Sequence, residues 1–128
     1  MTDKYLLFEK SSPPTQSALT LTQQSVPIPI RIADRFWLRL RGLLGYTQAT
    51  LHFGLWILPC RGVHTIGMRM PIDIIFLNTD NKIIALHSHV PPFRYCFCFK
   101  AHSTLEFHCG FIQQKNLQIG DQIKISGQ

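Results

Sequence analysis

The aspartate at position 73 is the residue that could most clearly carry chemistry. It interrupts the run Ile72–Leu77, which is apolar on both faces and is typical of a central, buried strand. A carboxylate buried without partners costs several kcal/mol, so Asp73 must be paired, hydrogen-bonded or protonated. It could serve as a general acid or base, or as a ligand anchor. We favour a structural role, in which Asp73 accepts backbone amides of the Cys60–Met68 segment or pairs with Arg69.

Glu106 is the second candidate. It belongs to an expected strand, Ser103–Cys109, and shares one face of that strand with Thr104 and His108. Such a face could form a site, or it could be the solvent-facing side of a sheet. We favour the solvent-facing interpretation.

The third candidate is the Cys60–Met68 segment, in which Cys60, His64 and Met68 recur at four-residue steps. On a helix these side chains would line one face and resemble soft-metal ligands. The glycines and β-branched residues of the segment argue against a helix. We therefore expect no metal or other cofactor, and a soft-metal or thiol site at these three positions stays open as the weaker alternative.

Four cysteines occur, at positions 60, 96, 98 and 109. The apolar stretch near the N-terminus is limited to Tyr5–Phe8 and is flanked by acids, which does not fit a secretory signal. We therefore expect a cytoplasmic protein whose cysteines are thiols rather than disulfides. Cys96 and Cys98 would share a face of an extended segment, so a joint role for them stays open.

Mostly short strands must position these residues. Alternation over Ile28–Ala33 predicts a half-buried strand, and Pro29 favours an edge position for it. Asp34 is a suitable N-cap for a helix over 34–44, and Gly45 is suited to end that helix in a left-handed conformation. Further strands are expected at 55–58, 72–77, 82–90, 103–109 and 122–126, with an irregular segment at 60–70, a loop at 91–102 and a helical turn near 111–116.

These elements predict an α+β, strand-rich single domain with one main helix. Because one helix can cover only one face of the sheet, we expect the antiparallel or mixed sheet to curl into a partly open barrel. Residues 1–25 are rich in Ser, Thr, Gln and Pro and are expected to form a flexible tail. Residues 26–128 are then the globular domain.

The formal charge of +6 suggests nucleic acid at first sight. However, the basic residues are scattered, and Arg35 and Arg39 would form an ordinary solvated stripe on a helix, so we do not expect nucleic-acid binding. No apolar run approaches the roughly 20 residues that span a bilayer, so no membrane span is expected.

An ordered series of short motifs resembles a known family. The series is Gly42-Leu43-Leu44-Gly45, then Pro59-Cys60-Arg61-Gly62-Val63-His64-Thr65-Ile66-Gly67-Met68, then Met70-Pro71-Ile72-Asp73-Ile74-Ile75-Phe76-Leu77, with Leu105-Glu106, Gly110 and Ile119-Gly120-Asp121. It is similar to the family catalogued as domain of unknown function 192, over about Pro29–Ser126. Many relatives have Trp-Met-Lys-Asn-Thr where this chain has His64–Met68. The resemblance implies a compact, strand-rich α+β fold with a partly open barrel, and no particular reaction, substrate or cofactor.

Two classes of function are compatible with the sequence. The first is a non-catalytic accessory or ligand-binding domain for a small-molecule or protein partner, with a concave side bordered by Asp73, Glu106 and the loop that holds His64, Thr65 and Met68. The second is a small hydrolase or transferase that uses Asp73 or Glu106 as base and His64 as acid. We favour the binding domain, because the sequence contains no nucleophile motif and no phosphate loop.

Overall fold

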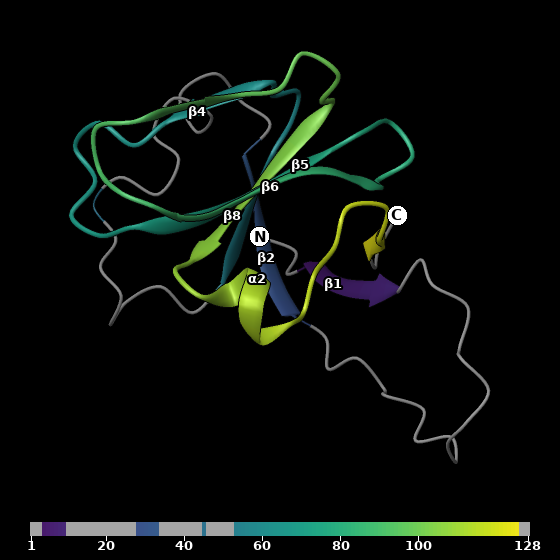
Figure 1. Cartoon of the computed structure of the whole chain (residues 1–128). Helices are drawn as coiled ribbons and strands as arrows, with labels where there is room; N and C mark the ends of the chain where they lie inside the picture. Colours follow the sequence, from purple (N-terminus) through teal and green to yellow (C-terminus); the bar gives the residue numbers. More distant parts are fainter. Residues whose placement is uncertain (1–3, 10–27, 34–44, 46–52, 126–128) are drawn as a thin grey trace.

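The fold is described from a computed structural model, which defines residues 4–9, 28–33, 45 and 53–125. These residues form a strand-rich α+β structure with one short helix (Figure 1). The elements in chain order are β1 Lys4–Glu9, β2 Ile28–Ala33, β3 Gly54–Ile57, β4 Gly62–His64, β5 Ile72–Leu77, β6 Ile83–Val90, β7 Tyr95–Phe97, β8 Ser103–His108, α2 Phe111–Gln114 and β9 Gln122–Ile125.

Seven of the strands form one mixed sheet in the order β6-β5-β8-β3-β2-β1-β9, and β4 pairs with β7 in a separate two-stranded sheet. β2 and β3 are parallel, whereas the other paired strands described are antiparallel. β5 lies between β6 and β8, and all six of its residues are buried. The expectation of a central strand at Ile72–Leu77 is confirmed.

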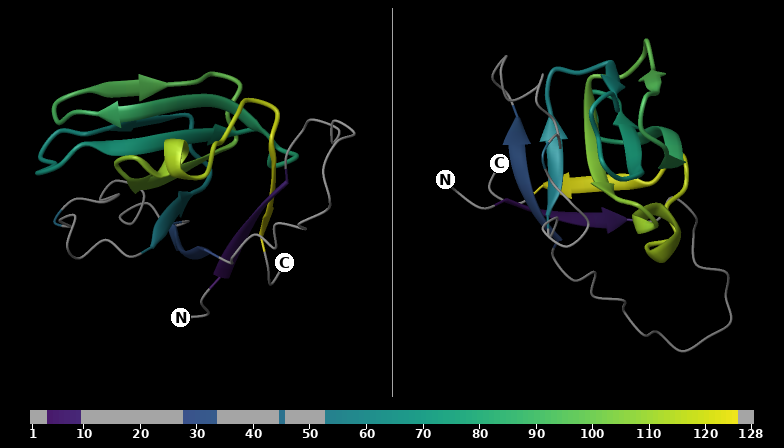
Figure 2. Two further views of the ribbon diagram at one scale, coloured as in Figure 1. Left: turned by 60° about the horizontal axis from the view of Figure 1, so that its bottom comes forward. Right: turned by 90° about the vertical axis from the view of Figure 1, so that its left-hand side faces the viewer.

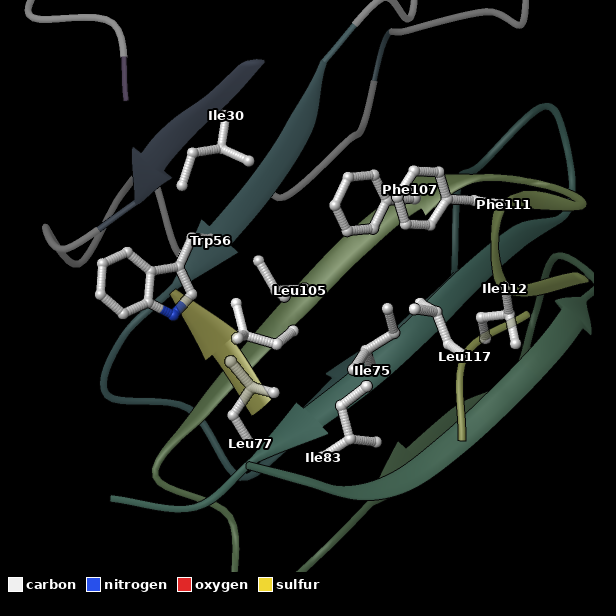
Figure 3. Close-up of a cluster of buried hydrophobic side chains, with 11 residues drawn as sticks. Ile30, Trp56, Ile75, Leu77, Ile83, Leu105, Phe107, Phe111, Ile112 and Leu117 are labelled. Atoms are coloured by element: carbon white, nitrogen blue, oxygen red, sulfur yellow. The ribbon is translucent and has the colours of Figure 1, made fainter. Parts of the chain in front are cut away.

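The large sheet has an apolar cluster on each face, because successive residues of a strand point to opposite faces. On one face, Ile75 and Leu77 pack with Leu105, Trp56 and the short helix α2 (Figure 3). On the other face, side chains of β5 and β3 pack beneath the β4–β7 pair. Figure 1 shows α2 and β4 on opposite sides of the sheet. The residues of this second cluster include Leu55, Ile57, Ile72, Ile74 and Phe76, with Val63, Cys96 and Cys98 packed against them.

The two edge strands of the large sheet, β6 and β9, approach each other. Gln122, at the start of β9, forms an isolated bridge with Lys82, the residue before β6. The amide of Ile83 also donates to the Asp121 carbonyl at 3.0 Å, and the amide of Ile123 to the Asn81 carbonyl at 2.9 Å. Figure 2 shows β1 and β9 running alongside each other and across the direction of β2 and β3. The sheet is strongly curved, but it keeps two edge strands and is not a closed barrel.

Four local expectations require correction. β2 lies between β1 and β3, so the edge position inferred from Pro29 is wrong; a proline near the start of a strand removes only one ladder donor. Lys4–Glu9, expected to belong to a flexible tail, form β1 between β2 and β9. The expected loop 91–102 contains β7, and the expected irregular segment 60–70 contains β4.

The helix predicted over 34–44 lies outside the described residues. Gly45, predicted to be left-handed, has a φ of 86°. The strands expected at 55–58, 72–77, 82–90, 103–109 and 122–126 and the helical turn near 111–116 are observed, with ends displaced by one or two residues. Among the described residues, the structure has no helix of the length and apolarity that a bilayer crossing requires.

Candidate functional site

Asp73 is fully buried at the second position of β5 and accepts two backbone amides. Its Oδ1 accepts from the His89 amide at 2.9 Å, and its Oδ2 accepts from the Ile112 amide at 2.8 Å. The predicted burial and amide bonding are confirmed. The donors, however, lie in β6 and α2, not in the Cys60–Met68 segment, and Arg69 forms no ion pair with Asp73 in the described part of the chain. One carboxylate therefore ties two distant segments to β5.

A β-bulge brings His89 to this carboxylate. The register between β5 and β6 shifts by one residue, so that Ser88 and His89 together lie opposite Asp73. His89 has a φ of 53°, in the left-handed region that residues other than glycine seldom adopt. Bulges commonly change the direction of a side chain near a functional site. Here the bulge turns the His89 amide toward Asp73.

Asp73, His89 and Cys109 form a cluster of three metal-ligating side chains. One ligand atom from each residue lies within 4.8 Å of the others. Asp73 lies near the start of β5, His89 near the end of β6, and Cys109 directly after β8, so three antiparallel neighbours meet at one end of the sheet. His89 and Cys109 were not predicted from the sequence as neighbours of Asp73, because they are far from it along the chain. The one available signal was that the strands expected at 72–77 and 82–90 are consecutive, because a hairpin of these two strands places the end of β6 beside the start of β5.

Cysteine, histidine and aspartate side chains within mutual reach also occur around cysteine nucleophiles. In such sites the pKa of the cysteine is lowered, because only the thiolate attacks. Here, burial and then the negative charge of Asp73 raise the pKa of the Cys109 thiol. Both effects disfavour the thiolate form that a cysteine nucleophile requires.

Glu106 lies on the opposite face of the sheet from Asp73. It pairs with Ile74 of β5, so its side chain shares the Ile74 face, and the preceding residue, Asp73, points the other way. Glu106 is only 3% exposed, so the solvent-facing interpretation is wrong. The sheet separates the two carboxylates, and they do not converge on one reacting atom.

The β4–β7 pair explains the burial of Glu106, because it covers that face of the sheet. Cys96 of β7 packs against the apolar cluster beneath the pair. Burial and then the charge of Glu106 raise the pKa of the Cys96 thiol. All four cysteines of the chain are thiols, as expected.

The remaining sequence candidates are divided between core and surface. Thr65 is 1% exposed; its hydroxyl donates to the Pro91 carbonyl at 2.7 Å and accepts from the Arg94 amide at 2.9 Å. Met68 is 7% exposed and packs in the apolar cluster of the Glu106 face. Cys60 and His64, by contrast, line a hollow at the surface. Thr65 is thus a structural tie between two loops, and Met68 is a core residue.

The hollow has a volume of about 660 Å³ and is formed by two segments, Pro59–His64 and Tyr95–Phe97. We call it the β4–β7 hollow. Its lining is mainly apolar, and Arg61 and His64 are its basic residues. The sequence indicated that Cys96 and Cys98 would share a face of an extended segment, but the pairing of β7 with β4 and the hollow between them were not predicted.

Four aromatic side chains near this hollow are exposed. The exposed fractions are 70% for Phe93, 77% for Tyr95, 56% for Phe97 and 79% for Phe99. The rings of Phe97 and Phe99 contact each other edge to face, with centroids 4.5 Å apart. Cys96 and Cys98 between them pack inward, as alternation along an extended segment requires. We call Phe93, Tyr95, Phe97 and Phe99 the aromatic stripe.

Comparison with solved structures supports the fold. A protein of Sinorhizobium meliloti, provisionally named a transcription regulator, superimposes with a TM-score of 0.78 at 16% identity, and the match covers 99% of this chain and 96% of that one. A protein of unknown function from Novosphingobium aromaticivorans superimposes with a TM-score of 0.72 at 16% identity, covering 95% and 83%. At this level of identity the similarity concerns the fold alone.

Comparison with sequences identifies the family. The UPF0127 protein of Thermococcus sibiricus is 31% identical over 99 residues, which cover 73% of this chain and 64% of that protein, so this chain spans less than two thirds of that relative. The UPF0127 protein of Pyrococcus furiosus is 27% identical over 107 residues, covering 79% and 90%. The model of the family DUF192, described as "Uncharacterized ACR", matches residues 18–125. This chain therefore belongs to the DUF192 family.

Proposed function

We propose that this protein is a non-catalytic binding domain, and that the β4–β7 hollow and the aromatic stripe receive an apolar segment of a partner protein. The single observation that carries this proposal is the exposure of four neighbouring aromatic side chains beside a mainly apolar hollow. Soluble domains seldom expose several large apolar side chains together unless another molecule covers them. Phenylalanine and tyrosine are also enriched at the centres of protein interfaces.

The extent of the stripe favours a protein segment over a small molecule. A volume of about 660 Å³ would suit a small ligand. Phe93 and Phe99, however, are not among the residues that line the hollow, so a ligand confined to it would leave them in water. An extended or helical segment that crosses β7 would cover all four rings.

The charges beside the stripe indicate the chemistry of the partner. Residues 59–70 and 91–102 contain basic side chains and no Asp or Glu. Arg61, Arg94 and Lys100 are all exposed there. Complementarity therefore favours a segment that combines apolar side chains with acidic ones.

The same geometry does not favour the hydrolase or transferase alternative. Asp73 and Glu106 project from opposite faces of the sheet, whereas a general acid and base must reach the same substrate. His64 lines the hollow without either carboxylate among the lining residues.

The test is selection from a random peptide display library, followed by affinity measurement with the selected peptides as probes. We expect peptides that contain aromatic or aliphatic residues together with Asp or Glu. Tyr95→Ser and Arg61→Gln should each weaken their binding about tenfold, which is the effect of losing about 1.4 kcal/mol at one interface residue. These side chains are exposed, so both variants should fold.

Ile119→Ser is the matched control, because Ile119 is 66% exposed and does not line the hollow. It should bind the same peptides as the parent. Failure to enrich any peptide, or equal weakening by the control, would contradict the proposal. The protein could instead bind a single-stranded oligothymidine more tightly than the selected peptides. If Tyr95→Ser weakened that binding, the stripe would be identified as a base-stacking surface.

We further infer a cytoplasmic location, because four thiols without a disulfide suit a reducing compartment.

The bridge between Lys82 and Gln122 supports a partly open barrel as the description of the curved sheet. We retain residues 26–128 as the globular domain, with β1 as an addition from the N-terminal segment.

A further inference from the structure

We propose that Asp73, His89 and Cys109 form a binding site for one divalent transition-metal ion of the Zn²⁺ type. The three residues come from β5, from β6 and from the residue after β8, and one ligand atom of each lies within 4.8 Å of the others. This site lies at an end of the large sheet and includes none of the residues that line the β4–β7 hollow. It is therefore independent of the binding function proposed above.

The distances suit a metal after a small adjustment. Zinc binds sulfur at about 2.3 Å and nitrogen or oxygen at about 2.0–2.2 Å, so tetrahedral ligand atoms lie roughly 3.4–3.7 Å apart. The present separations, within 4.8 Å, would have to close by at most roughly 1.1–1.4 Å to reach that spacing. His89 is exposed and Cys109 is only half-buried, so both side chains have room to rotate. Asp73 would remain in place.

Hydrogen bonds already hold the carboxylate of Asp73 in one orientation, as they do for ligands in metal sites. Each of its carboxylate oxygens accepts one backbone amide, from His89 and from Ile112. An ionised carboxylate oxygen can accept more than one bond, so each oxygen retains a lone pair for a metal. Hydrogen bonds of this kind orient ligands and tune their affinity.

The charge of the buried carboxylate is the second observation that points to a cation. Asp73 is fully buried, and within the described residues neither Lys nor Arg forms an ion pair with it. Two amide dipoles compensate part of the cost of burying a carboxylate, and a bound cation would compensate the remainder.

The backbone around His89 supports a built site. The β-bulge places two residues opposite Asp73, and His89 keeps a left-handed φ of 53°. Such conformations cost free energy and recur at ligand-binding sites, where surrounding contacts maintain them. Without the bulge, regular pairing would not bring the amide and the side chain of His89 to the same carboxylate.

The donor set indicates the class of metal. A thiolate, an imidazole and a carboxylate together suit Zn²⁺ or Co²⁺, whereas Ca²⁺ and Mg²⁺ prefer oxygen ligands alone. Three protein ligands leave one tetrahedral position for water or for another ligand.

The test measures binding of Zn²⁺ to the reduced, metal-free protein by competition with a chromophoric chelator. We expect one Zn²⁺ per chain. His89→Gln and Cys109→Ser should each reduce the affinity at least tenfold, in the range seen when metal-site partners are removed. Both side chains are at or near the surface, so these variants should fold even where Asp73→Asn does not.

Matched controls are His87→Gln, which changes the second histidine of β6, a half-buried one, and Cys98→Ser, which changes a cysteine of another segment. Both should bind Zn²⁺ as the parent does. Co²⁺ provides a spectroscopic readout, because a thiolate ligand gives a charge-transfer absorption that Cys109→Ser should abolish and Cys98→Ser should retain. Absence of stoichiometric binding, affinity unchanged in both site variants, or a cobalt spectrum without the thiolate band would each overturn the proposal.

Discussion

Asp73 has two features at the residue scale. Its buried carboxylate accepts two backbone amides, and it lies in the cluster with His89 and Cys109. It links the end of β6 and the start of α2 to the central strand through two amide bonds. Hydrogen bonds to a charged acceptor are stronger than neutral ones, so most of this linkage depends on the ionised form. The stability of the domain should therefore depend on the charge at this position.

Asp73→Asn tests that dependence. Asparagine keeps the shape, but it presents an NH₂ group to one of the two amide donors. We expect a loss of about 2–3 kcal/mol in the free energy of unfolding and a decrease of about 5–10 °C in Tm. Asp80→Asn, at an exposed turn position, should leave the Tm unchanged. A thermal melt that shows the Asp73 variant to be as stable as the parent would mean that Asp73 is a strained functional group rather than a structural one.

Cys96 provides a second prediction at the residue scale. Burial and the nearby Glu106 charge both disfavour its thiolate and raise its pKa, so alkylation should begin only above the pH range of an unperturbed cysteine. Glu106→Gln removes the charge and leaves the burial, so the midpoint of the alkylation profile should fall and still exceed that of a free thiol. Mass spectrometry after iodoacetamide treatment across a pH series measures the midpoint. An identical midpoint in parent and variant would show that the Glu106 charge does not act on Cys96.

At the scale of elements, β3 packs on the face of the sheet that α2 covers, and this packing depends on the absence of a side chain at Gly54. A Cβ at this position would overlap the ring of Phe107. That ring is 1% exposed and stacks on Phe111, with ring centroids 3.7 Å apart (Figure 3). The ring therefore has no free space into which to move.

Gly54→Ala should consequently destabilise the protein by about 1–3 kcal/mol, the usual cost of overpacking a close-packed core. Gly62→Ala is the matched control. A Cβ at Gly62 meets the ring of Phe97, which is 56% exposed and can turn into solvent. Urea unfolding should therefore show a smaller loss for Gly62→Ala. Equal losses in the two variants would indicate that Phe107 can rearrange as easily as a surface ring.

At the scale of the whole molecule, β1 connects the edge strand β9 to the rest of the large sheet. It pairs with β2 on one side and with β9 on the other, although β1 and β9 come from opposite ends of the chain. β9 in turn contacts the segment before β6 through the Lys82–Gln122 bridge. The curvature of the sheet therefore depends on an N-terminal strand.

Deletion of residues 1–9 should remove this connection and destabilise the protein by on the order of 3–5 kcal/mol, because two strand ladders lose their partner. Amides of β9 should then exchange with solvent faster than those of β5. Deletion of residues 1–3 is the control, since it leaves β1 intact. Unchanged exchange in β9 after the longer deletion would show that β1 contributes little to the sheet.

The sequence by itself determined the family and most of the element order. Alternation and apolar runs are local signals, so they located β3, β5, β6, β8 and β9 within one or two residues. They also indicated that Asp73 must be buried and hydrogen-bonded, because a carboxylate in an apolar strand permits little else.

Only the tertiary structure decided which groups Asp73 meets and which face each residue occupies. The pairing of β5 with β8 places Glu106 and Asp73 on opposite faces, a consequence of register that alternation within one strand does not reveal. The bulge that brings His89 to Asp73 depends on one extra residue in β6. The hollow forms because β4 pairs with β7, although both strands lie in segments that were expected to be irregular or loops. These contacts join segments far apart in the chain, and the energy that selects them comes from long-range burial rather than from local propensity.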